Sequence, residues 1–75
     1  MSRLPSFKSK EVIRCLERAG YVRWRQSGSH LVLYRKLDNK TVTIPVHFGK
    51  DVPKGTLRAI IREAGMSVEE FLKLA

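Results

Sequence analysis

The segment QSGSHLVLY, residues 26–34, is the stretch around which this chain is organised. Residues 27–29 favour a tight turn, because glycine and serine are among the residues that turns prefer. The turn places His30 at the first position of an apolar run, and basic and aromatic side chains alternate just before it, over residues 23–25. The segment therefore predicts a turn that presents a histidine at the start of a strand, next to positive charge.

Three short runs around this turn have the composition of β-strands. Residues 21–26 alternate apolar and basic side chains, which is typical of a half-exposed strand. Residues 30–36 and 41–44 are the second and third predicted strands, with a turn over residues 37–40 between them. Pro45 has no N–H to donate to a ladder, so it marks a strand end or a sheet edge. Connections this short predict an antiparallel meander.

The second predicted strand has two different faces. Leu31 and Leu33 share one face, whereas His30 and Tyr34 share the other, because side chains alternate along a strand. If the leucines lie against the helices, His30 and Tyr34 lie on the open face of the sheet. Val32 makes the second face partly apolar as well, so the alternation alone leaves this assignment open.

Two longer segments have the periodicity of amphipathic helices. The first helix is predicted to begin at Ser9, whose hydroxyl can accept a hydrogen bond from a backbone N–H of the first turn, and to end before Gly20. The second helix is predicted to begin at Pro53, where a missing N–H costs nothing, and to be closed by Gly65. Each helix would bury one apolar stripe against the sheet.

A capping box over residues 67–70 predicts a short third helix from Val68 to Leu74. The order of elements is therefore α-β-β-β-α with an extra C-terminal helix. Such an order is typical of the α+β class, here a sandwich with a three-stranded antiparallel sheet and helices on one of its faces. With 75 residues, the chain is expected to form a single domain over residues 1–75.

The charge of the chain is unevenly distributed. The formal net charge is +8. Residues 1–50 contain 11 Lys/Arg against 3 Asp/Glu, whereas residues 51–75 contain 4 of each class. A small and one-sidedly basic domain indicates a polyanionic partner, either the phosphates of a nucleic acid or an acidic protein. The alternative, a solvated basic surface without a partner, fits this asymmetry less well.

Part of this charge follows the first predicted helix, where Lys10, Arg14 and Arg18 recur at every fourth position. The spacing produces a basic ridge about 12 Å long at 1.5 Å rise per residue. Either the ridge follows phosphates, or it is a solvent face on which Glu11 and Glu17 pair locally with the arginines. The spacing does not decide between these two interpretations.

Several kinds of chemistry are disfavoured by composition. One cysteine, Cys15, cannot form an intramolecular disulfide, and its place beside an apolar stripe predicts a core residue. The two histidines, His30 and His47, do not have zinc-ligand spacing, so no metal is expected. Phosphate-binding glycine loops and apolar runs of about 20 residues are missing, so we expect no cofactor and no membrane contact.

The remaining constellation suits cleavage of RNA through its own 2′-hydroxyl. The protein then supplies one acid–base group that titrates near neutral pH, and histidine is the side chain for that task. His30 is the candidate, and the cations that stabilise the developing phosphorane charge would come from Arg25, Lys50 or Lys54. Lys50 and Lys54 also flank the start of the second helix, where unpaired N–H groups attract phosphate. A lone histidine at a strand start is, however, more often an ordinary surface residue.

The chain resembles the HicA family of bacterial toxins, small mRNA-cleaving ribonucleases of type II toxin–antitoxin pairs. Four segments carry the resemblance, namely residues 9–21, 26–30, 43–47 and 55–72. The resemblance implies a fold like that of the double-stranded-RNA-binding domain. Proteins of that fold contact RNA through the first helix, the first β–β loop and the start of the second long helix.

The resemblance also implies roles for individual residues. The family's catalytic histidine follows Gly-Ser, which places that role on His30, with Gly28 and Ser29 as the turn residues that position it. His47 matches a recurrent family histidine, which either binds phosphate, acts as a second acid–base group or only hydrogen-bonds the loop. The residues expected to bind RNA are Lys10, Arg14, Arg18, Arg23, Arg25, Lys50 and Lys54.

The sequence therefore predicts a cytoplasmic toxin, bacterial or archaeal, that cleaves mRNA without a metal ion. The resemblance implies an antitoxin of the HicB family as the partner, with an acidic surface that covers His30. Two other classes of function remain open. A non-catalytic RNA-binding module explains the charge and fold equally well but not the histidine on a Gly-Ser turn. A protein-interaction domain would use its basic face only to bind an acidic chain.

Overall fold

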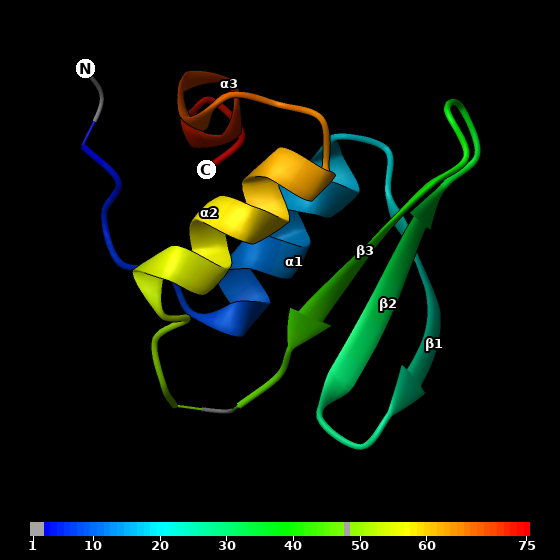
Figure 1. The fold of residues 1–75 in the computed structure, drawn as a ribbon, viewed down its shortest axis with the longest axis horizontal. Coiled ribbons are helices and arrows are strands. Elements are labelled where there is room, and N and C mark those ends of the chain that lie inside the picture. The colour runs from blue at the N-terminus through cyan, green and yellow to red at the C-terminus, as the bar shows by residue number, and fades with distance from the viewer. Residues whose placement is uncertain (1–2, 48) are drawn as a thin grey trace.

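Along the chain, one helix precedes and two helices follow a continuous run of three strands (Figure 1). The computed structural model describes residues 3–47 and 49–75. The elements are α1 (Ser9–Arg18), β1 (Val22–Ser27), β2 (His30–Arg35), β3 (Lys40–Pro45), α2 (Lys54–Glu63) and α3 (Val68–Leu72). The predicted order, α-β-β-β-α with a short terminal helix, is confirmed. None of the helices among the described residues has the length and apolar character needed to cross a membrane.

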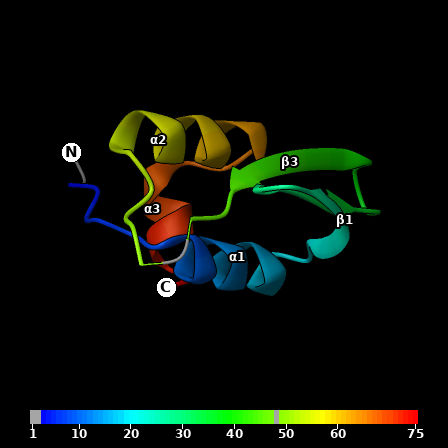
Figure 2. The same ribbon diagram turned by 90° about the horizontal axis from the view of Figure 1, so that it is seen from below.

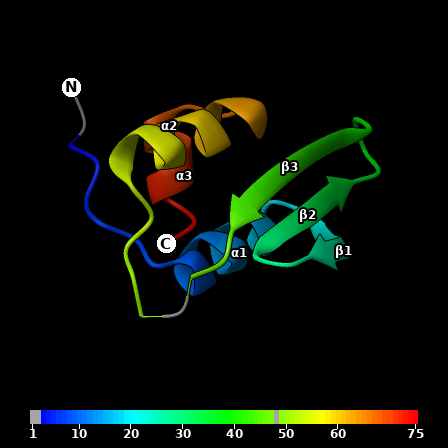
Figure 3. The ribbon, with the colours of Figure 1, turned by 60° about the horizontal axis from the view of Figure 1, so that its bottom comes forward.

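The sheet is an antiparallel meander in the order β1-β2-β3, as the short connections predict. In this register His30 lies between Ser27 of β1 and Pro45 of β3. Pro45 is the last residue of an edge strand, which agrees with its inability to donate to a ladder. Figure 3 shows the β1–β2 turn and the chain leaving β3 at the same end of the sheet.

The three helices lie together on one side of the sheet, and no helix of the described chain covers its other side (Figure 2). Leu31 and Leu33 are buried against the helices, whereas His30 is exposed on the uncovered side. This settles the question that alternation left open, because the leucines occupy the helix-facing side of β2. We refer to the uncovered side of the sheet as the outer face.

The core is formed by the apolar stripes that periodicity predicts. Val12 and Leu16 of α1 and Leu57 of α2 are fully buried against the helix-facing residues of the sheet. Cys15 is also buried, and this burial raises the pKa of its thiol. Its surroundings support the interpretation that Cys15 is a core residue. Phe71 of α3 completes the core and packs edge-on against Phe7, with ring centroids 5.1 Å apart.

The helix α1 begins at Ser9, as predicted, but two side chains at predicted boundaries make tertiary contacts instead of the expected local ones. Ser9 does not cap α1: Lys8 occupies the N-cap position, and the buried Ser9 hydroxyl donates to the carbonyl oxygen of Pro45 at 2.8 Å. Tyr21 precedes β1 instead of starting it, since its ring is buried and its hydroxyl donates to the carbonyl of Ala64 at 3.2 Å. The third helix ends at Leu72, two residues earlier than predicted.

The prediction that β1 is half exposed is wrong, because all six of its residues are exposed. The register explains why the alternation misleads. Arg23 pairs with Leu33 and Arg25 pairs with Val32, so Trp24 is an extra residue in a β-bulge. A bulge interrupts the in–out alternation and re-aims side chains. Arg23 therefore faces the helix side of the sheet, while Arg25 lies on the outer face.

Arg35 joins the C-terminal ends of the two long helices. Its guanidinium donates to the carbonyl oxygens of Ala19, at 3.0 Å, and Ala64, at 3.5 Å. It also forms two hydrogen bonds to the carboxylate of Asp38, at 2.9 and 2.6 Å, which lower the pKa of that carboxyl. A cation is favourable at helix C-termini, where carbonyl groups lack partners. Arg35 therefore stabilises the packing that holds the sheet against both helices.

Candidate functional site

The turn before His30 is held on both sides by hydrogen bonds. Gly28 has a φ of 56°, a conformation that glycine adopts without steric cost. The side-chain amide of Gln26 donates to the Gly28 carbonyl at 3.1 Å. On the other side, the backbone N–H of Val46 donates to the carbonyl of Ser29 at 2.6 Å. The turn is therefore anchored within its own hairpin and to the end of β3.

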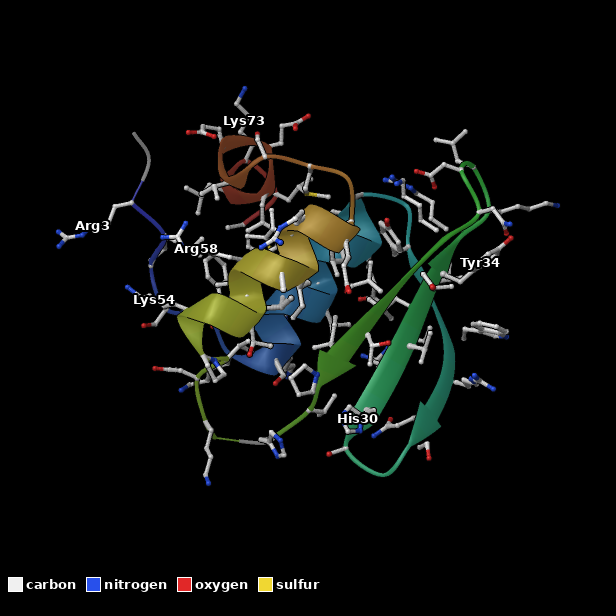
Figure 4. The ribbon with its side chains drawn as sticks, viewed as in Figure 1. Arg3, His30, Tyr34, Lys54, Arg58 and Lys73 are labelled. Atoms are coloured by element: carbon white, nitrogen blue, oxygen red, sulfur yellow. The ribbon has the colours of Figure 1, made fainter. Side chains whose placement is uncertain are left out.

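His30 lies at the end of the sheet, on the outer face and away from the helices (Figure 4). Its side chain is exposed and makes no hydrogen bond or ion pair with any residue that the structure describes. The imidazole is therefore available to an incoming ligand, because neither ring nitrogen is hydrogen-bonded to a residue in the described part of the chain. The backbone around it is fixed by strand pairing to Ser27 and Pro45.

His47 belongs to a different surface at the same end of the molecule. It lines a hollow of about 350 Å³ between the start of α1, the helix-facing side of β1 and the loop after β3. Ile13, Leu31 and Val46 form the apolar part of the hollow, and Lys10 and Arg23 contribute positive charge. Leu31 is next to His30 in sequence but points to the opposite side of the sheet. The two histidines therefore lie at one end of the sheet on opposite sides of it.

The cations around this hollow are not equally free. Arg23 lies 3.7 Å from a carboxylate oxygen of Glu17, and Lys8 lies 3.0 Å from one of Asp51. Lys10 has no ion-pair partner among the described residues. It is therefore the lysine of the hollow whose charge is best placed to meet an anion.

The three cations of the basic ridge predicted along α1 line two different hollows. Lys10 lines the hollow with His47, whereas Arg14 and Arg18 line a small depression beside the C-terminus of the chain. The guanidinium of Arg18 donates to the carbonyl of Leu74 at 2.5 Å. Arg18 therefore contributes to the attachment of the C-terminal segment, whereas Lys10 lies beside a different hollow.

The remaining predicted RNA-binding residues lie on three different surfaces. Arg25 lies on the outer face with His30, two residue pairs further along the hairpin, because it pairs with Val32. Lys54 lies at the start of α2, well separated from His30 (Figure 4). Lys50 is exposed in the loop after β3, and its backbone N–H donates to the carbonyl of His47 at 3.2 Å.

The sequence prediction of the site omitted an aromatic pair on the outer face. The rings of Trp24 and Tyr34 lie 6.0 Å apart, centroid to centroid. The guanidinium carbon of Arg25 lies 5.0 Å from the centroid of the Trp24 ring. The alternation of basic and aromatic residues before the turn indicated these side chains. Strand alternation placed Tyr34 on the same face as His30, but it did not indicate that a bulge would bring Trp24 to that face beside Tyr34.

Among residues 3–47 and 49–75, no group of three or more His, Cys, Asp or Glu side chains is arranged to hold a metal ion.

Comparison with protein families matches residues 9–66 to the family described as the HicA toxin of bacterial toxin–antitoxin systems. The match covers well over half of the chain and includes both histidines and every element from α1 to α2. A comparison with curated proteins found no match.

Proposed function

This chain belongs to the HicA toxin family, and from that membership we propose that it is an endoribonuclease that cleaves mRNA with His30 as its acid–base residue. Membership makes it the toxin of a toxin–antitoxin pair. The ribonuclease activity and the role of His30 are the proposal. The observation that carries it is the exposed imidazole of His30, presented by an anchored Gly-Ser turn with no competing partner among the described residues.

The chemistry requires only one titrating group from the protein. The neutral imidazole of His30 accepts the proton of a ribose 2′-hydroxyl, whose oxygen then forms a bond to the adjacent phosphorus. The bond between phosphorus and the 5′-oxygen breaks, and the imidazolium returns its proton to that leaving oxygen. The products are a 2′,3′-cyclic phosphate and a free 5′-hydroxyl. Because the RNA supplies the nucleophile, the proposed reaction needs no metal ion.

Negative charge that develops on the phosphorane needs a nearby cation. Arg25 is the best placed of the three predicted candidates, because it lies on the outer face close to His30 along the hairpin. Lys54 lies far from His30 (Figure 4), so we assign it to binding the RNA backbone beyond the cleaved bond. Lys50 stands in the loop beside His47 and is assigned to the same task.

His47 is assigned to phosphate binding instead of proton transfer. It lies in the hollow with Lys10 and Arg23, on the other side of the sheet from His30. A second acid–base group would have to reach the same phosphodiester as His30. The position of His47 on the opposite side of the sheet disfavours such simultaneous contact. An RNA strand that passes over the end of the sheet would instead meet His30 on one side and the basic hollow on the other.

A toxin of this family has a cognate antitoxin. We propose that the antitoxin belongs to the HicB family and that an acidic surface of it covers His30. The formal charge of +8 favours such a partner, since the same cations would attract RNA and an acidic protein. The proposed place of action is the cytoplasm, where mRNA and the antitoxin are both present.

The deciding experiment compares wild-type protein, His30→Ala and His47→Ala on single-stranded RNA in the presence of EDTA. We expect wild type to release fragments and His30→Ala to lose at least a factor of about 10² in rate, the lower end for acid–base catalysis. His47→Ala serves as the matched control, since it removes an exposed histidine from the other side of the sheet and should weaken binding more than the cleavage step. Circular dichroism would verify that each variant is folded.

Other outcomes would contradict parts of the proposal. Normal cleavage by His30→Ala would remove the catalytic assignment, and loss of cleavage only in His47→Ala would transfer it to His47. RNA binding without any fragments from wild-type protein would support the non-catalytic module. Binding to the antitoxin with none to RNA would support a protein-interaction domain.

A further inference from the structure

The outer face of the sheet exposes large apolar and aromatic side chains. Val22 and Trp24 are each 58% exposed, and Tyr34 lies beside the Trp24 ring. The hydroxyl of Tyr34 is hydrogen-bonded to the side-chain oxygen of Asn39 at 2.9 Å, which fixes the orientation of the ring. Exposed aromatic surface of this kind has no role in the core, and contiguous apolar patches on small proteins mark sites of interaction.

These aromatic rings share the outer face with His30. The register pairs Val22 with Tyr34 and Ser27 with His30, so both pairs project to the same side of the hairpin. Tyr34 is four residues after His30, which corresponds to roughly 14 Å along β2 at about 3.4 Å per residue. A short extended ligand lying along β2 would therefore contact the histidine at one end and the aromatic pair at the other.

The charge of the outer face selects the kind of ligand. No acidic residue projects from the three strands on this face, which carries Arg25 and His30 among apolar, hydroxyl and aromatic side chains. Arg25 lies over the Trp24 ring, so a cation stands next to the plane on which another ring would stack. Aromatic side chains combined with basic ones are the usual surface for single-stranded nucleic acid, because every base has a face that stacks and every nucleotide has a phosphate.

We propose that Trp24 and Tyr34 form a base-stacking platform that binds single-stranded RNA next to the cleaved phosphodiester, with Arg25 between platform and His30. The inference rests on the proposed ribonuclease function and extends it to a substrate-binding site. The bulge at Trp24 is the structural device that exposes the indole on this face. The platform would accept unpaired bases and exclude duplex RNA, whose bases are stacked inside the helix.

Trp24 is the only tryptophan of the chain, so its fluorescence reports directly on the platform. The test titrates the His30→Ala protein, which should not cleave, with an unstructured RNA oligonucleotide. Stacking of a base on the indole should quench the fluorescence in a saturable way. An abasic oligonucleotide of the same length keeps the phosphates but has no bases, and we expect it to bind weakly without quenching.

A second arm measures affinity by a method independent of fluorescence. In the His30→Ala background, Trp24→Ala should raise the Kd for single-stranded RNA by roughly 5- to 150-fold, the range expected for loss of one stacked base. Trp24→Phe should recover most of the affinity, because phenylalanine retains a stacking surface. Leu37→Ala is the matched control, since Leu37 is 88% exposed in the β2–β3 turn and should leave the Kd unchanged.

The outcomes separate this inference from the proposed function. Absence of quenching together with an unchanged Kd for Trp24→Ala would overturn the platform. Loss of antitoxin binding in Trp24→Ala with an unaltered Kd for RNA would likewise overturn it and make the outer face a protein interface. In either case cleavage by wild type and its loss in His30→Ala would leave the ribonuclease proposal standing. Quenching that the abasic oligonucleotide reproduces would also contradict base stacking.

Discussion

His30 is accessible because the residues before it form a turn, and that turn depends on one backbone conformation. Gly28 has a positive φ and no heavy atom within 4 Å of the position where a Cβ would stand. A Cβ at this position would therefore meet no neighbour, and the backbone conformation is what opposes a substitution. Substitution at this position therefore tests conformational strain with little contribution from a steric clash at the new Cβ.

Replacing Gly28 should lower stability according to how well the new residue tolerates a left-handed backbone. Gly28→Val should decrease the free energy of unfolding by about 1–2 kcal/mol, and Gly28→Asn should decrease it less. Urea unfolding of the two variants would measure the difference. Cleavage should be slower in Gly28→Val, because a distorted turn displaces His30. Equal stability for valine and asparagine would show that the turn changes conformation without cost.

At the scale of elements, α1 and α2 are joined to the sheet by one side chain of β2. Arg35 donates hydrogen bonds to the last carbonyls of both helices, and its guanidinium carbon lies over the ring of Tyr21, 4.6 Å from the ring centroid. Alternation along β2 puts Arg35 on the same face as the buried Leu31 and Leu33, which is an unusual place for a cation. The structure explains it through the carbonyl groups that both helices leave unpaired at their ends.

Removing this connection should weaken the whole domain. Arg35→Ala should lower the free energy of unfolding by about 2 kcal/mol, because it leaves a partly buried carbonyl at Ala19 without its donor. Arg58→Ala is the control: Arg58 is exposed on α2 without a partner among the described residues, so its loss should change stability by less than about 0.5 kcal/mol. Thermal or urea unfolding would measure both. Similar effects for the two arginines would mean that the helix ends do not depend on Arg35.

Over the whole molecule, the distribution of charge should control how binding depends on salt. The net charge of +8 arises entirely within residues 1–50, which include α1, the sheet and the loop after it. Because Arg18 is hydrogen-bonded near the C-terminus and Lys10 is free in the hollow, the two cations are expected to differ in their contribution to RNA binding.

We expect the RNA affinity of the His30→Ala protein to fall steeply with salt concentration. For single strands each phosphate contact contributes about 0.7 to the slope of log K against log salt, so Lys10→Ala should reduce that slope by about 0.7. Arg18→Ala should change it little, and Trp24→Ala should reduce affinity without altering the slope. Filter binding over a series of salt concentrations would provide the slopes. If Arg18→Ala also reduced the slope by about 0.7, Arg18 would contact a phosphate as Lys10 does, and the basic ridge on α1 would act as one surface.

The sequence by itself determined the order of elements, the buried stripes and the turn that presents His30. These features depend on neighbours along the chain: periodicity decides which face is buried, and glycine and serine decide where a turn forms. The family resemblance was likewise readable from four segments and is confirmed by the match over residues 9–66.

Only the tertiary structure decided which surfaces these residues share. Ser9 bonds to Pro45, 36 residues away, instead of capping its own helix. The bulge turns Trp24 to the outer face, beside Tyr34, and the loop after β3 carries His47 to the opposite side of the sheet. Such contacts depend on strand register and on packing between distant segments, and no local pattern contains that information. The sequence therefore identifies His30, whereas the fold defines the RNA-facing surface that we propose around it.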